Sequence, residues 1–173
     1  MMLTVRRAEL ARFKALLQSG VPVRAGARRS VLSFLVDDLG LAPEYVRQRI
    51  TTVFLDDQVV DVLEDAVLRD GSRLALSAAM PGLVGATLRR SGPYAAMRAE
   101  ITRSSEHGVD ARTPAATTLI RVKLFNLLLE EMGPALLERG VLLEPEAIEA
   151  LGYDAGAAPR DSGDLVELRV RFE

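Results

Sequence analysis

The stretch from residue 51 to residue 92, TTVFLDDQVVDVLEDAVLRDGSRLALSAAMPGLVGATLRRSG, constrains the fold more than any other part of the chain. Val53 and Leu55 alternate with more polar neighbours before a turn over 56–58, and the extended chain then continues. Asp70-Gly71 is a strong turn signal directly before the alternating run RLAL. The pattern predicts strands joined by tight turns, followed by a glycine-punctuated apolar loop that ends in paired arginines.

Helix and strand signals on both sides of this stretch indicate a protein that mixes both kinds of structure. The predicted elements are a helix over 5–18 that stops at Gly20, an edge strand over 21–25 that contains Pro22, a helix capped by Ser30 and ended by Gly40, a short helix from Pro43, a helix from Pro93, a strand over 119–125, a helix after Asn126 that is interrupted at Gly133-Pro134, and a short helix from Pro145 through Leu151. Residues 166–172 show the cleanest alternation of apolar and charged residues and predict a half-buried, paired strand of the main sheet.

Composition narrows the classes of protein to which this chain can belong. Its 173 residues fit one domain, and 49% hydrophobic residues with 27% charged residues are typical of a globular protein. Without cysteine there are no disulfides, thiolate catalysis or cysteine-ligated metals. A net charge of −2 and few aromatic residues argue against a nucleic-acid partner, and no apolar run is long enough for a membrane span. We expect a cytoplasmic protein.

The basic residues are strongly biased toward arginine: only Lys14 and Lys123 are lysines, and the rest of the 22 are arginines. A codon bias that favours Arg, Ala, Gly and Leu together is one explanation. Selection for bidentate anion contacts is the other, since a guanidinium makes them better than an ammonium group.

We predict an α+β fold, with a mixed, mainly antiparallel sheet covered by helices and with β-grasp character in residues 21–80. An N-terminal helix and a β-grasp-like unit would occupy residues 1–102. The polar segment 103–117 would be a loop or linker, and residues 118–173 would form a strand-helix-strand unit packed on the same sheet. A single compact domain is also compatible with these signals.

Residues 29–85 resemble the second half of the ubiquitin-like β-grasp domains that serve as bacterial sulfur carriers, such as the small subunit of molybdopterin synthase. The matching segments are SVLSFLVDDLGL, ITTVFLDDQVVD and LRDGSRLALSAAMPGLVG. The segment IRVKLFNLLLEEMG also resembles the opening strand and helix of such carriers, but it follows the other half in this chain. Either the C-terminal strands complete a rearranged β-grasp, or they belong to a second αβ unit.

The resemblance does not extend to carrier chemistry. Sulfur carriers act through a free C-terminal Gly-Gly carboxylate, whereas the corresponding segment here, Met80-Pro81-Gly82, is internal and no Gly-Gly pair occurs. Asp56-Asp57 also replaces the usual Asn-Gly, and Ser72 replaces the second Asp of the family's turn.

The segment 80–92 is the best candidate binding site. Its glycines would allow backbone N–H groups to approach a ligand, and its arginines could hold an anion. The candidate residues are Gly82, Gly85, Arg89, Arg90, Ser91 and Gly92. A close-packed loop with solvated arginines is the simpler interpretation, and an apolar contact through Leu83 and Val84 with a partner subunit is a third.

No other pattern predicts catalysis or metal binding. His107 lies near Glu106 and Asp110 in a polar segment, but these residues do not define a metal site. The adjacent carboxylates 37–38, 56–57 and 130–131 diverge on a helix or strand, and no serine has a Gly-x-Ser-x-Gly context.

The sequence therefore favours a non-catalytic binding or assembly module that acts through protein–protein contacts, as a homo-oligomer or with a protein partner, and that needs no cofactor. The alternative is a small-molecule binder or enzyme that uses the 80–92 segment, with Arg89 and Arg90 on an anionic ligand.

Overall fold

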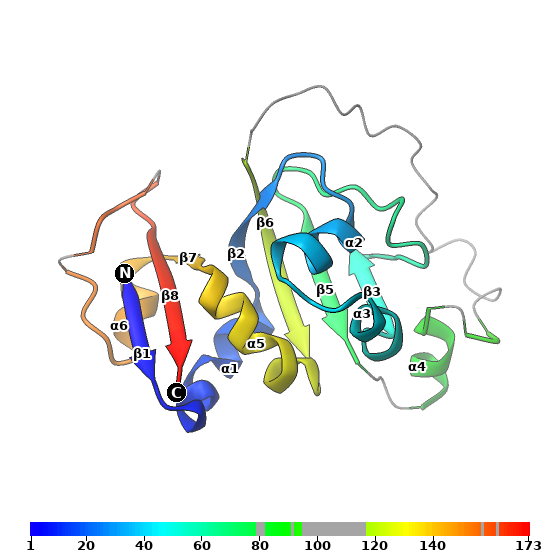
Figure 1. The fold of residues 1–173 in the computed structure, drawn as a ribbon, viewed down its shortest axis with the longest axis horizontal. Helices are drawn as coiled ribbons and strands as arrows, with labels where there is room; N and C mark the ends of the chain where they lie inside the picture. The colour runs from blue at the N-terminus through cyan, green and yellow to red at the C-terminus, as the bar shows by residue number, and fades with distance from the viewer. Residues whose placement is uncertain (79–81, 91, 95–116, 157, 162) are drawn as a thin grey trace.

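The computed structural model describes residues 1–78, 82–90, 92–94, 117–156, 158–161 and 163–173 (Figure 1). Its strands are β1 (Met2–Val5), β2 (Val21–Gly26), β3 (Thr52–Leu55), β4 (Gln58–Val59), β5 (Arg73–Ser77), β6 (Thr117–Phe125), β7 (Val141–Leu143) and β8 (Val166–Phe172). Its helices are η1 (Arg7–Glu9, a 3-10 turn), α1 (Leu10–Ser19), α2 (Val31–Ser33), η2 (Phe34–Asp38, a π-helix), α3 (Pro43–Arg49), α4 (Gly82–Leu88), α5 (Leu128–Arg139) and α6 (Pro145–Ala150).

The strands form two mixed sheets, which confirms an α+β protein whose pairing is mainly antiparallel. The five-stranded sheet has the order β2-β6-β5-β3-β4, and the three-stranded sheet has the order β1-β8-β7. Only the β5–β6 and β1–β8 pairs are parallel among the strand pairs of the described residues. The two sheets lie side by side along the longest axis of the molecule, with α5 between them (Figure 1).

The expectation of one sheet was wrong, and β8 is the strand for which this matters most. It is paired, as its alternation predicted, but it is the central strand of the smaller sheet and does not join the larger one. Alternation shows which face of a strand is buried and carries no information about its neighbours, so the sequence could not assign β8 to a sheet.

The C-terminal part of the chain contributes directly to the larger sheet. Strand β6 lies between β2 and β5, which precede it in sequence by about ninety and about forty residues respectively. Residues 95–116, which include most of the predicted helix after Pro93 and of the predicted linker, lie outside the described residues. The predicted N-terminal and C-terminal units thus share a sheet at β6.

The N-terminus differs from the helix predicted over 5–18. Residues 2–5 form β1, and the α-helix begins only at Leu10. The backbone N–H of Arg169 donates to the carbonyl of Met1 (2.9 Å), and that of Glu173 donates to the carbonyl of Val5 (3.0 Å). These bonds come from β8, some 165 residues away, so local periodicity could not reveal the strand.

Several local predictions are confirmed. The Ser30 hydroxyl accepts a hydrogen bond from the Ser33 N–H (3.1 Å), which caps α2, and Gly40 ends the following turn with φ of +69°. Strand β2 is an edge strand of its sheet, as Pro22 indicated. The turn after β3 is tighter than predicted, because only Asp56 and Asp57 turn, both at positive φ, and Gln58 already belongs to β4.

Helix α5 continues through Gly133-Pro134, where an interruption was predicted. A proline inside a helix leaves the carbonyl four residues earlier without its N–H donor. Here that carbonyl belongs to Glu130, and it accepts a hydrogen bond from Arg7 Nη2 (3.0 Å). A Cβ atom on Gly133 would lie 3.1 Å from Leu17 Cδ1, so glycine lets α1 approach α5 closely.

The two sheets contain the same three-stranded arrangement, which the sequence analysis did not detect. Helix α1 ends in LLQSG and leads into β2, while α5 ends in LLERG and leads into β7. Both terminal glycines have nearly the same conformation, with φ of 105° at Gly20 and 117° at Gly140. Each following strand pairs antiparallel with a central strand (β6 or β8), which in turn pairs parallel with a third (β5 or β1).

One hydrophobic core connects the two sheets. Phe13 on α1 is fully buried and lies among aromatic rings, 6.3 Å from the ring of Tyr153 and 6.4 Å from that of Phe172. On β8, Val166, Leu168 and Val170 are also fully buried. Strand β8 therefore contributes to the core that the larger sheet depends on.

We expect Leu168→Ala to lower the free energy of unfolding by about 2–5 kcal/mol, because it leaves a cavity at the centre of the smaller sheet. Leu127→Ala is the matched control, since the side chain of Leu127 is 54% exposed, and its effect should stay within about 0.5 kcal/mol. Urea denaturation of both variants measures the difference. Equal midpoints would show that β8 is not part of the cooperative core.

Candidate functional site

The segment predicted to be a glycine-rich loop is largely a helix. Residues 82–88 form α4, which Gly82 enters with φ of +76°, and Gly85 is buried within it. Two glycines three residues apart do not prevent a helix when the residues around them are helix-compatible, so their spacing was misleading. Met80, Pro81 and Ser91 lie outside the described residues.

The structure gives the neighbouring arginines different surroundings. Arg89 is exposed, whereas Arg90 is partly buried against the end of α3. Arg90 Nη2 donates to the carbonyl of Val46 (3.1 Å), and its Nε donates to the carbonyl of Ile50 (3.1 Å). Its guanidinium therefore satisfies carbonyls at the C-terminal turn of a helix, which have no partner within the helix.

The backbone of this segment is also held in place. The N–H of Arg90 donates to the carbonyl of Thr51 (2.7 Å), and the N–H of Gly92 donates to that of Arg89 (3.2 Å). A Cβ atom on Gly92 would lie 3.1 Å from the Arg89 carbonyl oxygen, so a larger residue would crowd the tight turn after α4. Burial lowers the pKa of Arg90, while the charges of Glu64 and Asp61 raise it.

The adjacent carboxylates are all held by basic residues of the chain: Asp37 and Asp38 share Arg29, and Asp56 and Asp57 share Arg73. Asp56 accepts the backbone N–H of Arg73 (2.8 Å), and Asp37 pairs with Arg29 (2.9 Å). Glu130 pairs with Lys14. His107 lies outside the described residues, and within the part of the chain that is described no group of three or more His, Asp or Glu side chains could hold a metal ion.

Glu131 joins α5 to α3. It accepts a hydrogen bond from the Tyr45 hydroxyl (2.7 Å) and pairs with the guanidinium of Arg49. Burial raises the pKa of the Tyr45 phenol, and the hydrogen bond to Glu131 and its charge raise it further. The hydrogen bond from Arg49 lowers the pKa of Glu131, against a smaller opposing effect of burial. Both groups therefore stay in their usual protonation states near neutral pH, as a structural link and not as an acid–base pair.

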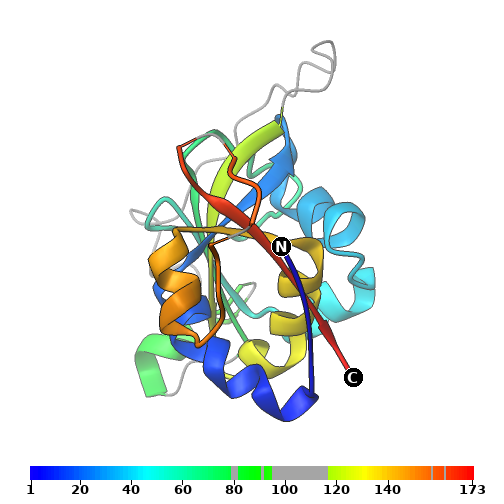
Figure 2. The same ribbon diagram turned by 90° about the vertical axis from the view of Figure 1, so that its left-hand side faces the viewer.

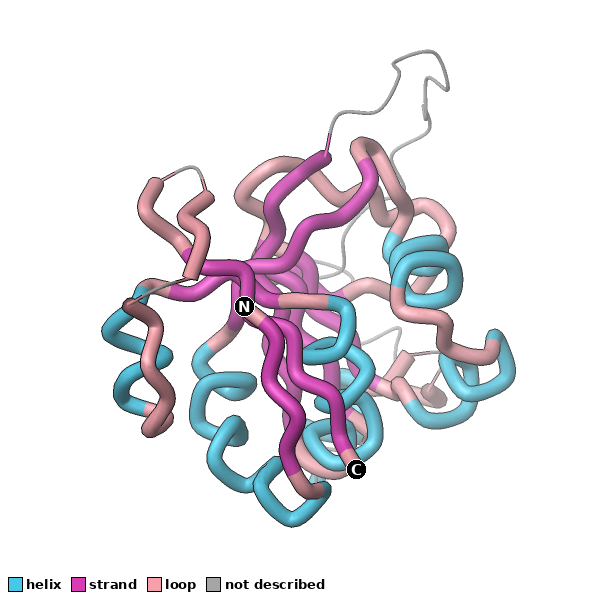
Figure 3. The backbone as a smooth tube through the Cα atoms, turned by 60° about the vertical axis from the view of Figure 1, so that its left-hand side comes forward, coloured by secondary structure: helices cyan, strands magenta, loops and turns pink. Residues whose placement is uncertain are grey.

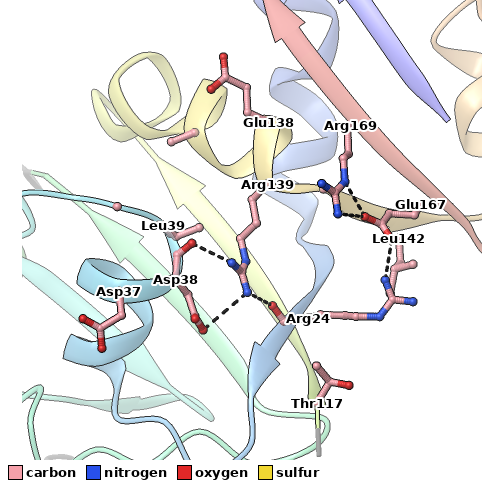
Figure 4. A pocket seen from close by; sticks show the side chains of 13 residues that line it. Arg24, Asp37, Asp38, Leu39, Thr117, Glu138, Arg139, Leu142, Glu167 and Arg169 are labelled. Carbon is pink, nitrogen blue, oxygen red and sulfur yellow. Dashed lines mark hydrogen bonds and ion pairs between the residues drawn. The ribbon is translucent and has the colours of Figure 1, made fainter. Parts of the chain in front are cut away.

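A charged cleft lies where the two sheets meet (Figure 4). Its volume is about 660 Å³, and it is bordered by the end of η2, the edge of β2, the last turn of α5 and the start of β8. Its charged lining residues are Arg24, Asp37, Asp38, Glu138, Arg139, Glu167 and Arg169. The volume falls in the range of small-molecule sites, but such sites are lined mainly by apolar side chains.

Arg139 is the central group of the cleft. Its Nη1 donates to the carbonyl of Asp38 (2.8 Å), and its Nη2 donates to the carbonyl of Arg24 (2.8 Å) and lies 3.6 Å from the Asp38 carboxylate. Figure 4 shows the guanidinium pointing between these two segments and not into open space. Arg139 thus ties α5 to the end of η2 and to the edge of β2.

A second group of ion pairs closes the other side of the cleft. Arg24 Nη1 lies 2.8 Å from Glu167 Oε2, and Arg24 also pairs with Asp161. Arg169 Nη2 lies 2.7 Å from Glu167 Oε1. Burial alone would raise the pKa of Glu167, but the hydrogen bonds and charges of Arg169 and Arg24 hold it below its usual value. Among the described residues, all the charged side chains that line the cleft except Glu138 take part in ion pairs.

The sequence analysis missed this cleft because its residues are far apart in the chain. Residues 24, 38, 139 and 167 come together only through the topology of the two sheets. The sequence pointed to Arg89 and Arg90 because these two arginines are adjacent in the chain.

No protein-family model, curated protein or solved structure matches this chain. Among the described helices, none is both long and apolar enough to span a membrane.

We expect Arg90→Ala to lower the free energy of unfolding by roughly 1.5–3 kcal/mol, because it removes a charged donor from two carbonyls at the end of α3. The matched control is Arg89→Ala, an exposed neighbour whose replacement should change stability by no more than about 0.5 kcal/mol. Thermal or urea denaturation distinguishes them. Equal stability of the two variants would show that the capping contact contributes nothing.

The lowered pKa of Glu167 predicts a pH dependence of stability. A carboxylate whose pKa is lower in the folded than in the unfolded chain stabilises the fold above its unfolded value of about 4.3, and this stabilisation is lost as pH falls through the folded value. Glu167→Gln should therefore have a lower melting temperature than the wild type at pH 7, with the difference shrinking in acid. Glu138→Gln, which lies in the same cleft and removes no ion pair among the described residues, should show no such trend.

Proposed function

We propose that this protein is a non-catalytic, cytoplasmic binding module that assembles through protein–protein contacts, as a homo-oligomer. One observation carries the proposal: the guanidinium groups at both candidate ligand positions are already held by carbonyls and carboxylates of the chain itself. Arg90 is bound to the carbonyls of Val46 and Ile50, and Arg139 to those of Arg24 and Asp38. These two arginines stabilise the fold, and their guanidinium groups are engaged without a ligand.

The ligand-binding alternative requires these contacts to break. An anion that recruited Arg90 together with Arg89 would leave two partly buried carbonyls at the end of α3 without donors, at a cost of about 1–3 kcal/mol each. In the cleft, an anion would also compete with Glu167 for Arg24 and Arg169. An assembly module needs none of these rearrangements.

We also propose that the five-stranded sheet is a rearranged β-grasp unit. In support, residues 120–125 of β6 resemble the opening strand of the sulfur carriers, and β6 lies between β2 and β5 in the sheet that contains the rest of the resemblance. Helices α2, η2 and α3 connect β2 to β3, where the resemblance has its helix. We propose this β-grasp relationship for the architecture only, because no Gly-Gly pair occurs in the sequence.

Sedimentation velocity over a range of protein concentrations tests the assembly proposal. We expect a species with at least twice the mass of one chain, and no increase in melting temperature on addition of inorganic phosphate. A monomer at every concentration would contradict the proposal. A monomer that phosphate stabilises, and that loses this response in Arg89→Ala, would favour the ligand-binding alternative.

A further inference from the structure

Strand β1 forms an open edge of the smaller sheet, whereas the other edges are protected. Strand β4 has only two residues, and β7 has three buried residues that lie against β2. On β2, Pro22 lacks an N–H, and Arg139 already occupies the carbonyl of Arg24. Edges blunted by proline, very short length or covering resist pairing with other chains. Strand β1 has four residues and no proline, and no other described strand pairs with its outer side.

The backbone of β1 presents free hydrogen-bonding groups on its outer side. Odd-numbered residues face β8, since the carbonyls of Met1 and Val5 accept N–H groups of that strand. In a strand, the N–H and C=O of the alternate residues then point the other way, which places those of Met2 and Thr4 on the open side. No hydrogen bond links these groups to any residue in the described part of the chain. Figures 2 and 3 show β1 and β8 side by side at one end of the molecule.

We propose that this edge pairs with β1 of a second copy of the chain, antiparallel and about a two-fold axis, to give a continuous six-stranded sheet. This inference rests on the proposed assembly function and names its contact surface. Met2 of each copy would exchange two backbone hydrogen bonds with Thr4 of the other, so four bonds form in all. Leu3 would lie directly opposite Leu3 of the second copy.

The side chains are compatible with this self-pairing. Residues 2–5, MLTV, carry no charge, so two identical edges meet without repulsion between their own side chains. Met2 is 62% exposed and gains an apolar contact from the second copy.

Cysteine crosslinking tests the register directly, because the natural chain contains no cysteine. Residues opposite each other in a non-hydrogen-bonded antiparallel pair have Cα atoms about 4.5 Å apart, within the range that a disulfide spans. We expect Leu3→Cys to form a covalent dimer under mild oxidation. Leu127→Cys, at an exposed position on a different part of the molecule, should remain monomeric on a non-reducing gel.

Proline at position 4 tests the backbone contacts. Thr4→Pro removes an N–H that points away from β8, so the fold should keep its circular dichroism spectrum. It also removes two of the four hydrogen bonds across the axis, and we expect at least about a tenfold rise in the dimer dissociation constant. Thr4→Val, which retains the N–H, should dimerise like the wild type. In the Leu3→Cys background, Thr4→Pro should abolish crosslinking.

The outcomes separate this inference from the proposed function. An oligomer that persists in folded Thr4→Pro, with no crosslinking through Leu3→Cys, would overturn the β1 contact and leave the assembly function intact. Absence of any oligomer in the wild-type chain would overturn both.

Discussion

The fold depends on the pairing of β6 with β5 at the centre of the larger sheet. Leu74 and Leu76 of β5 lie in register with Val122 and Leu124 of β6, and all four side chains are fully buried. Without β6, the edge strand β2 would have no partner in this sheet. Closing the loop between two strands this far apart in sequence has an entropic cost, which the buried side chains of the pair help to offset.

Arginine side chains recur as caps for carbonyls that the helices leave unpaired. Arg90 binds carbonyls at the end of α3, Arg139 binds that of Asp38 at the end of η2, Arg121 Nη1 binds that of Gly20 after α1 (2.8 Å), and Arg7 binds the one freed by Pro134 in α5. A guanidinium suits this role because it offers several donors in a fixed plane. Part of the bias toward arginine therefore has a structural explanation, in addition to any codon preference.

The repeated three-stranded arrangement explains why the halves of the chain cannot be separated. In each sheet a strand that follows a helix and a glycine pairs with a central strand, which pairs with a third. Both sheets combine strands from the two halves of the chain, because β6 joins β2 and β5 in the larger sheet and β1 joins β7 and β8 in the smaller one. The larger sheet is extended by β3 and β4, whereas the smaller one stops at β1. The same construction therefore leaves one covered sheet and one with an open edge.

The sequence by itself determined the α+β class, most of the local helices and strands, and the residues at which several of them begin or end. Ser30, Gly40, Pro43 and the Asp56-Asp57 turn act through their own backbone preferences, so they could be recognised without the fold. Tertiary structure alone decided which strands became neighbours, because alternation specifies a buried face and not a partner. Tertiary structure also decided the contacts of Arg90, the continuation of α5 through Pro134 and the formation of the charged cleft. Each depends on groups brought together from distant parts of the chain. The helix at 82–88 was also decided by the tertiary structure. Its glycines permit either a loop or a helix, and only the surrounding structure selects one.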